Sequence, residues 1–363
     1  MNDVMINALG EVPHAQSEAR ALAQRPYIAT AGPNRGHSVV AYHTGQFDGS
    51  GKPVYGEKRI HSNATLRKDE WIQLDNQVLE SARERLVIVD DMREAGLTHN
   101  AGGLGTIVSE WETSSEMTDA DVTMDGESKT DKDDQEFGLQ GVPIPVIQKP
   151  FTIGERMLMS SRQRGADLET TKGVEAGRAI ARTSEKLVFY GSKVSNVNSA
   201  GDKYSIPGLT TFGGRATASI SDWDDDDNVT PEDIDQDILA LVAHMEKNER
   251  HFGPFNLYIP AEYARRFRED YKDFGTRSLM DVVEGRDVIA RVRVSDVLNK
   301  GDVVMVQMER TVLDLAMAAD LTTVQWESGS GWTNNFQSFA AWAPRLKQDF
   351  DGHSGIMHAT VGE

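Results

Sequence analysis

The 363-residue sequence contains no cysteine. Disulfides, thiolate nucleophiles and cysteine metal sites are therefore excluded, and packing must hold the fold together. The sequence also lacks an apolar run of about eighteen residues, the length that a membrane-spanning helix requires. Its first 22 residues have neither the basic start nor the apolar stretch of a secretory signal. We therefore expect a cytoplasmic origin and no contact with a membrane.

Basic residues are scarce relative to acidic ones. The chain has 38 Lys and Arg against 57 Asp and Glu, a formal net charge of −19. Nucleic-acid-binding proteins gain affinity by neutralising phosphates with clustered Lys and Arg, and the sequence contains no such cluster. If the protein meets nucleic acid, we expect it to enclose the polymer rather than to grip it.

Catalytic motifs are missing as well. The sequence has no HExxH, GxSxG, Walker or GxGxxG pattern. The glycine-rich bend at residues 100–105 leads into a strand-like stretch, whereas phosphate-binding loops lead into a helix. His353 and His358 are five residues apart near the end of the chain, a spacing that predicts opposite faces. We therefore predict no catalytic residues, no cofactor-binding residues and no metal site.

An acidic run at residues 221–237 resembles a calcium loop in part. Oxygen-bearing side chains fall at the ligand positions of such a loop: Asp224, Asp226, Asn228, Thr230, Glu232 and Asp235. Val229 occupies the position that requires glycine, and Asp235 replaces the final bidentate Glu. Thr230 followed by Pro231 also predicts an ordinary helix start. A calcium-dependent soluble binding protein remains the alternative from a different functional class.

The longest helical pattern runs from 168 to 190, which corresponds to roughly 35 Å of helix. Asp167 or Thr170 can cap its start, and Gly191 supplies the permissive backbone on which helices end. One face carries small residues, which predicts a close crossing with another helix: Gly173, Ala176, Gly177 and Ala181.

A second helix is predicted before it, from the cap candidates at 62–65 to Gly96. Its apolar face consists of Trp71, Leu74, Val78, Ala82, Leu86 and Val89. The preceding residues, 1–62, are rich in turn signals, with a hairpin expected around residues 48–51. We interpret them as an arm that docks on the body or on a neighbouring chain, because they cannot bury enough apolar surface alone.

The sequence pattern of residues 106–150 predicts a segment that projects from the body of the protein. A strand leads into a segment, 114–138, that holds nine acids and two lysines, and the chain returns through Pro143 and Pro145. These prolines exclude a central strand position, so the return path must be an edge or an exposed ribbon. A two-stranded ribbon is marginally stable in water. We therefore expect it to be supported by another copy of the chain.

The second half mixes helices and strands without regular alternation, which indicates an α+β fold. Helices are expected from 230 to 245, from 260 to 271 and from 276 to 284. Strands are expected at 255–259, 288–294, 302–307, 312–318, 322–326, 336–342 and 356–361.

This order of parts resembles the HK97-fold major capsid proteins of tailed bacteriophages, including the branch close to bacterial encapsulin shells. The resemblance covers roughly residues 60 to 361 as an ordered pattern. The residues that carry it are 66–97, the strand at 105–113, the return at 142–154 with Pro150-Phe151-Thr152-Ile153-Gly154-Glu155, the helix end Leu187-Val188-Phe189-Tyr190-Gly191, and Ile206-Pro207-Gly208-Leu209-Thr210.

The resemblance implies a division of the chain into six segments. These are an N-terminal arm (1–62), an N-terminal helix region of a peripheral domain (63–105), an extended loop (106–150), a peripheral domain with a long spine helix (151–204), an axial domain (205–310) and peripheral return strands (311–363). The arm is longer than an encapsulin-like chain requires, which favours a viral shell.

By the same resemblance, the chain is a structural major capsid protein without catalysis. It is expected to self-assemble, in the host cytoplasm, into hexameric and pentameric capsomers of an icosahedral virion that encloses double-stranded DNA without specific binding. Scaffold, portal and decoration proteins belong to the partners that the family implies. The alternative is an encapsulin nanocompartment shell around a cargo enzyme.

Some members of the capsid family cross-link a lysine of the extended loop to an asparagine of an adjacent subunit. By resemblance, Lys129 or Lys132 and Asn334 or Asn335 are the candidates in this chain. No Glu follows the asparagines closely, and the next acid is Asp349. This departure from the family pattern leaves the reaction without its base.

Overall fold

A computed structural model describes residues 6–7, 27–28, 38–47, 53–59, 68–115, 124, 137–164, 171–195, 204–272, 277–327 and 333–362. The strands of the arm are β1 (Ile6–Asn7), β2 (Tyr27–Ile28), β3 (Ser38–Phe47) and β4 (Pro53–Arg59). The antiparallel pairing of β3 with β4 confirms the predicted hairpin. The pairing of β1 with β15 docks the arm on the body, one of the two expected positions.

A long sheet forms the middle of the molecule, with the strand order β1-β15-β16-β8. Its main strands are β15 (Leu313–Glu327), β16 (Thr333–Leu346) and β8 (Val146–Gly154), and β5 (Thr98–Asn100) lies parallel to the start of β15. The two strands expected at 312–318 and 322–326 form one continuous strand, β15. The pairing shifts register between Met317 and Thr322, so the interruption in the sequence pattern is an irregularity rather than a turn.

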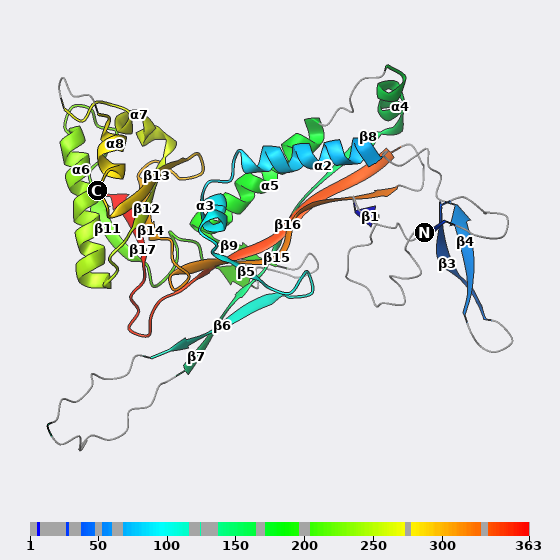
Figure 1. Ribbon diagram of the computed structural model, residues 1–363, viewed down its shortest axis with the longest axis horizontal. Helices are drawn as coiled ribbons and strands as arrows, with labels where there is room; N and C mark the ends of the chain where they lie inside the picture. Colours follow the sequence, from blue (N-terminus) through cyan, green and yellow to red (C-terminus); the bar gives the residue numbers. More distant parts are fainter. Residues whose placement is uncertain are drawn as a thin grey trace.

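Helices cover this sheet: α2 (Lys68–Arg83), α3 (Ile88–Glu94) and α5 (Thr171–Tyr190). Figure 1 shows α2 and α5 side by side, and α5 packs directly on β8 and β16. The prediction of a single helix up to Gly96 is wrong, because the helix breaks between α2 and α3. The N–H groups of Val87 and Val89 bond to the side chain of Glu185 instead.

The small face of α5 confirms the expected close crossing with α2. A Cβ on Gly177 would lie 2.6 Å from the carbonyl oxygen of Val78, and one on Gly173 would lie 2.7 Å from Leu74. Gly191, at φ 70°, ends the helix as predicted. The cap candidates Asp167 and Thr170 lie outside the described residues.

The end of α5 is held by the segment Ile206–Thr210, for which the sequence suggested no structural role. Leu209 and Thr210 donate their N–H groups to the carbonyls of Val188 and Phe189, at 2.9 and 2.8 Å. These carbonyls have no partner within the helix, so the segment satisfies them.

A second sheet has the order β11-β17-β14-β12-β13. Its strands are β11 (Ala216–Ile220), β17 (Ile356–Val361), β14 (Asp302–Gln307), β12 (Phe255–Pro260) and β13 (Ile289–Ser295). The strands within 311–363, expected as one set of peripheral return strands, divide between the two sheets. β17 pairs with β11 and β14, so the chain returns to the second sheet at its end.

Helices α6 (Pro231–His244), α7 (Ala264–Phe267) and α8 (Leu279–Glu284) pack around the second sheet, and a π-helical turn (Met245–Glu249) extends α6. The helix expected at 260–271 is shorter, with a 3₁₀ turn at Ala261–Tyr263 before α7. The two-stranded pair β9 (Ser192–Val194) and β10 (Tyr204–Ile206) was not expected.

The described residues form two hydrophobic cores. One packs around the long sheet and also includes Tyr258, Val304 and Ile356 of the second sheet, and the other lies between the second sheet and its helices. A buried polar contact also joins the two sheets. The hydroxyl of Tyr258 on β12 donates to Asp91 on α3 at 2.8 Å, and Arg293 on β13 donates to the same carboxylate at 2.7 Å. No helix among the described residues is long and apolar enough to cross a bilayer.

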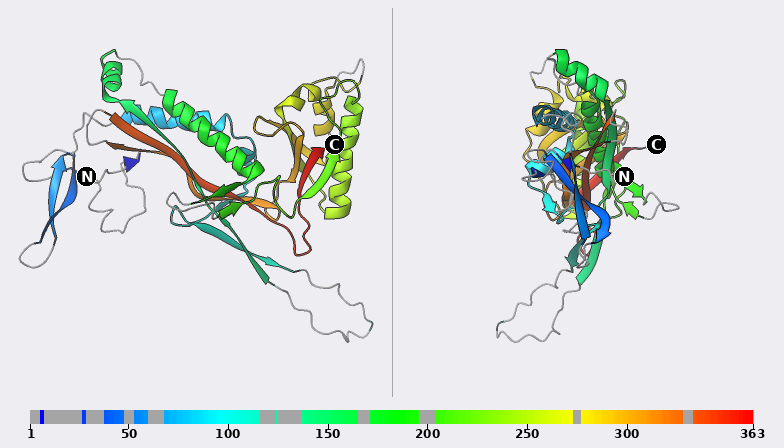
Figure 2. Two further views of the ribbon diagram at one scale, coloured as in Figure 1. Left: turned by 180° about the vertical axis from the view of Figure 1, so that it is seen from behind. Right: turned by 90° about the vertical axis from the view of Figure 1, so that its right-hand side faces the viewer.

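A two-stranded ribbon leaves the body between the two sheets. It consists of β6 (Val108–Ser114) and β7 (Phe137–Pro143), and both views in Figure 2 show it extending away from the rest of the described chain. Helix α4 (Glu155–Arg164) projects at the far end of β8.

Candidate assembly surface

The ribbon of β6 and β7 has two chemically different faces. The strands pair in register from Val108 with Pro143 to Ser114 with Phe137. Directly paired residues share a face, and successive residues alternate between faces. One face therefore turns toward the body, and the other turns to solvent.

The inward face of the ribbon is anchored by one side chain of β16. Ser109 and Val142 on this face are buried, and the guanidinium of Arg345 lies 5.6 Å from the centre of the Trp111 ring. Arg345 also donates to the hydroxyl of Ser109 at 3.4 Å. Because a two-stranded ribbon has no core, these contacts fix the direction in which it leaves the body.

Arg345 is itself held in a buried ion pair. Its guanidinium donates to both carboxylate oxygens of Asp314 on β15, at 2.5 and 2.6 Å, and Lys347 adds a bond of 2.9 Å. Burial opposes ionisation of Asp314, but hydrogen bonds from the two cations hold its pKa below the usual value. The anchor is therefore a charged cluster attached to the long sheet.

The outward face of the ribbon exposes large apolar side chains. Phe137 is 70% exposed, Leu139 67% and Val108 41%. The cross-strand partner of Leu139 is Glu112, and the partner of Gly141 is Glu110. Leu139 and Phe137 are neighbours on this face of β7, whereas Glu110 and Gly141 separate Val108 from them. Exposed apolar side chains of this size, bordered by carboxylates, are typical of a surface that a partner covers.

Helix α4 adds a second exposed apolar surface. Met157 and Met159 are 48% and 49% exposed, and α4 packs against β8. Its first residue, Glu155, is buried and accepts a bond of 2.9 Å from the side-chain amide of Asn334.

The Glu155 contact bears on the proposed cross-link. Asn334 is 2% exposed, so the lysine of an adjacent subunit cannot reach its side chain in this conformation, and Asn334 is excluded as the acceptor. Asn335, half-buried, pairs with Thr152 on β8. Lys129 and Lys132 lie outside the described residues.

The acidic run does not form a calcium site. The carboxylate of Asp224 pairs with Lys300 at 2.7 Å, Asp226 pairs with Arg265, and buried Asp235 pairs with Arg286 at 2.5 Å. Thr230 caps α6 in a capping box with Asp233, as its sequence predicted. Within the described ranges, no group of three or more candidate ligands converges on one point.

The two histidines that cluster in the sequence lie in different surroundings. His358 on β17 contacts Asp302 at 3.1 Å, whereas His353 lies in the preceding loop, 3.5 Å from Glu249. Each therefore contacts a different carboxylate, and the two do not form a shared site.

The sequence did not single out Glu185, a buried carboxyl on α5. Its oxygens accept N–H bonds from Val87, Ile88 and Val89 at 2.9, 3.3 and 3.3 Å, so it caps α3 from another helix. Burial raises the pKa of Glu185 to about 8 against the opposing effect of these bonds. An acid within a helical pattern is ordinarily exposed, so periodicity alone gave no signal.

Comparisons with known proteins place this architecture. A family model described as "Family of unknown function (DUF6260)" matches residues 61–359. The type 1 encapsulin shell protein EncA of Myxococcus xanthus is 23% identical over 294 residues, which cover 79% of this chain and 92% of EncA. A diheme-cytochrome-encapsulin shell fusion protein of Kuenenia stuttgartiensis is 23% identical over 269 residues, covering 74% of this chain and 68% of the fusion.

Solved structures share the fold. The virus-like particle from Pyrococcus furiosus has a TM-score of 0.55 at 17% identity, covering 80% of this chain and 98% of the other. The capsid of Myoviridae phage XM1 has a TM-score of 0.55 at 11% identity, covering 76% and 92%. The HK97-like capsid fold expected from the sequence is thereby confirmed, as is the encapsulin-related branch.

Proposed function

The chain belongs to the DUF6260 family and has the HK97-like fold of a shell-forming protein, and from this we propose that it is the major capsid protein of a tailed phage. In this proposal, it assembles into hexamers and pentamers of an icosahedral shell around double-stranded DNA, and it carries out no catalysis. Scaffold and portal proteins are its proposed partners, and its place is the virion.

The observation that carries shell assembly is the outward face of the ribbon. Phe137 and Leu139 are about two-thirds exposed on a pair of strands that has no core of its own. Burying one such side chain gains about 1.5–3 kcal/mol. A second copy that covers this face would stabilise both the apolar side chains and the ribbon.

Substituting these two residues tests assembly. We expect Phe137→Ser with Leu139→Ser to leave a folded subunit that does not form particles, because the apolar contact is lost. The matched control, Phe137→Leu with Leu139→Met, keeps the face apolar and should assemble. Sedimentation and electron microscopy distinguish the two, and particles of normal size from the serine variant would contradict this role of the ribbon.

The additional N-terminal residues favour a phage capsid over a nanocompartment. The family match begins at residue 61, and EncA is almost fully covered by 79% of this chain. The residues before this match include four strands, and β1 extends the long sheet. We propose that the rest of this segment contacts neighbouring subunits and so supports retention of densely packed DNA.

A specific observation favours the alternative, an encapsulin shell around a cargo protein. The two relatives above are encapsulin shells, and EncA aligns along nearly its whole length. The contents of purified, nuclease-treated particles separate the two functions. Protected double-stranded DNA is expected for the capsid, whereas a stoichiometric protein cargo without DNA would establish the nanocompartment.

A further inference from the structure

Four basic side chains gather around strand β5, at one end of the long sheet. His99 on β5 is paired with Ala316 on β15, two residues beyond Asp314. Residues two apart on a strand share a face, so His99 lies on the face that carries the Asp314 carboxylate. Arg345 and Lys347 both bind this carboxylate, at 2.5 and 2.9 Å.

Arg310 brings the fourth basic side chain to the same place. Its carbonyl accepts a bond of 2.6 Å from Lys347, and its guanidinium donates at 3.0 Å to the carbonyl of Gly96, just before β5. Arg310 is exposed and has no acidic partner among the described residues. The acid next to it, Glu309, accepts a bond of 3.2 Å from Gln307 on β14. Arg310 is therefore left without a direct counter-charge.

The charges of this basic cluster do not cancel. One carboxylate, Asp314, faces three permanent cations: Arg310, Arg345 and Lys347. Partial burial lowers the pKa of the His99 imidazole, and the three cations lower it further against the opposing charge of Asp314. A positive potential therefore surrounds His99, in a chain whose net charge is −19.

Solvent reaches the basic cluster at His99. This residue is exposed, and a hollow of about 290 Å³ opens beside it, lined also by Thr98, Asn100 and Asp320. Asp320 pairs with Arg93 at 2.8 Å, so its charge is compensated. Because a water molecule takes up about 30 Å³, the hollow has room for a small hydrated ion.

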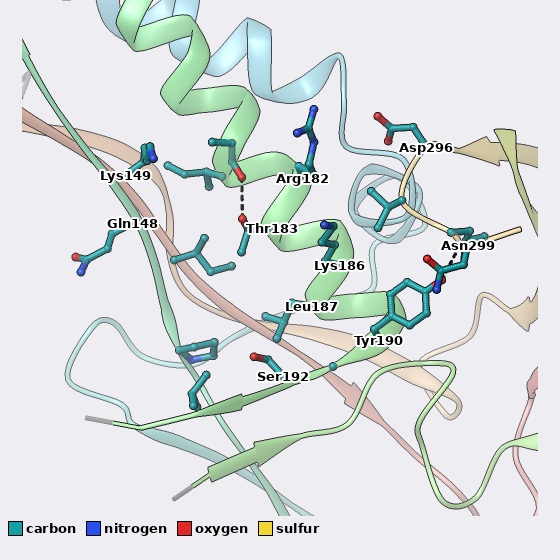
Figure 3. A pocket seen from close by; sticks show the side chains of 18 of the residues that line it. Gln148, Lys149, Arg182, Thr183, Lys186, Leu187, Tyr190, Ser192, Asp296 and Asn299 are labelled. Carbon is teal, nitrogen blue, oxygen red and sulfur yellow. Dashed lines mark hydrogen bonds between the residues drawn. The ribbon is translucent and has the colours of Figure 1, made fainter. Parts of the chain in front are cut away.

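A second group of exposed cations provides a comparison. Lys149 on β8 and Arg182 and Lys186 on α5 line an open groove of about 1250 Å³. Figure 3 shows Lys149 apart from the two basic residues of α5. Arg345 and Lys347, in contrast, are held together by one carboxylate. Convergence of cations therefore distinguishes the basic cluster from the groove.

We propose that His99, Arg310 and Lys347 bind a small oxyanion of the phosphate type. Guanidinium and ammonium groups form strong, charge-assisted hydrogen bonds with such anions, and the imidazole adds a donor. A bound dianion favours the imidazolium, so His99 takes up a proton on binding. Free phosphate and the phosphodiesters of nucleic acid share this chemistry. The site goes beyond the proposed function and does not depend on assembly.

Titration calorimetry of the full-length chain with sulfate tests the site. The charge of sulfate is constant between about pH 5 and pH 8, the range in which a histidine titrates. Sulfate stabilises folded proteins generally, so binding heat rather than melting temperature is the readout. We expect saturable binding that weakens as the pH rises through this range, because proton uptake by His99 becomes less favourable.

Single substitutions locate the site. Arg310→Gln should weaken sulfate binding at least tenfold, whereas Arg182→Gln, which removes an exposed cation of the groove, should leave it unchanged. His99→Gln should make the affinity independent of pH. In the unaltered chain, sulfate should raise the pKa of His99 in an NMR titration, a change that a purely structural role would not produce.

Three results would overturn the site: no saturable binding to the unaltered chain, an equal loss of affinity in the Arg310 and Arg182 variants with native circular dichroism, or a pH dependence that persists in His99→Gln. A short DNA duplex that competes with sulfate would support the site and assign it to phosphodiesters. Sulfate binding without such competition would support it with free phosphate as the ligand. Because no readout requires a shell, failure to bind and failure to assemble are distinguishable.

Discussion

At the scale of single residues, Glu185 has the most unusual environment. It is 1% exposed, and its carboxyl accepts three backbone N–H bonds at the start of α3. Because burial raises its pKa to about 8, the folded chain holds a proton on this group that the unfolded chain releases near the ordinary pKa of 4.5. The contribution of Glu185 to the free energy of unfolding is therefore fully present below pH 4.5 and is lost as the pH rises through about 8.

Glu185→Gln should remove this pH dependence. Glutamine keeps the shape and an acceptor oxygen but does not titrate. We expect the melting temperature of the unaltered chain to fall relative to that of the variant between pH 5 and about pH 8, where the unfolded chain has released the proton that the folded chain still holds. Thermal unfolding across this range measures the difference, and a difference that stays constant with pH would contradict the assignment.

Gly177 shows how one residue sets the distance between two helices. An alanine there would normally favour a helix by about 1 kcal/mol. Its Cβ would, however, lie 2.6 Å from the backbone oxygen of Val78, which cannot move without displacing α2.

Gly177→Ala should therefore destabilise the fold, by about 1–3 kcal/mol as overpacking does. Gly154→Ala is the control, because a Cβ at Gly154 meets nothing within 4 Å. Chemical denaturation of the unassembled subunit measures both variants. Equal stability of the two would show that α2 and α5 can separate freely.

At the scale of elements, the position of the ribbon depends on the Arg345 cluster. Arg345 is 5% exposed and joins Asp314 on β15 to Trp111 and Ser109 on β6. Removing one member of a buried ion pair leaves the other charge uncompensated, which is costly.

Arg345→Met should destabilise the subunit by about 3 kcal/mol, the lower end for a buried pair, because Lys347 still contacts Asp314. It should also shift the fluorescence of Trp111 toward that of a solvated indole. Arg85→Met is the control, since its pair with Asp296 is exposed and contributes about 1 kcal/mol or less. Equal losses in the two variants would disprove the anchoring role.

The elements also show what the sequence could predict. Local patterns were sufficient for α5, for its end at Gly191 and for the Thr230 cap of α6, because these depend on neighbouring residues. The break before α3 was not predictable, since it depends on Glu185, 97 residues from Ile88. The placement of β17 in the second sheet was likewise decided by pairing with β14, far away in the chain.

The candidate assembly surface likewise has parts that local sequence patterns predict and parts that depend on distant contacts. The ribbon was predictable from Pro143, Pro145 and its acidic, coreless connection. Its two faces and the Arg345 anchor were not, because they depend on register and on β16.

At the scale of the whole molecule, the chain carries an excess of acids, with a net charge of −19. Its fold and the projecting ribbon, which exposes Phe137 and Leu139, together favour an assembly of copies.

A cryo-EM map of concentrated, purified full-length protein is the most direct measurement of this account. It should show closed shells in which the ribbon of each copy lies over an adjacent copy. A solution that contains only monomers, with each ribbon lying against its own body, would contradict the account.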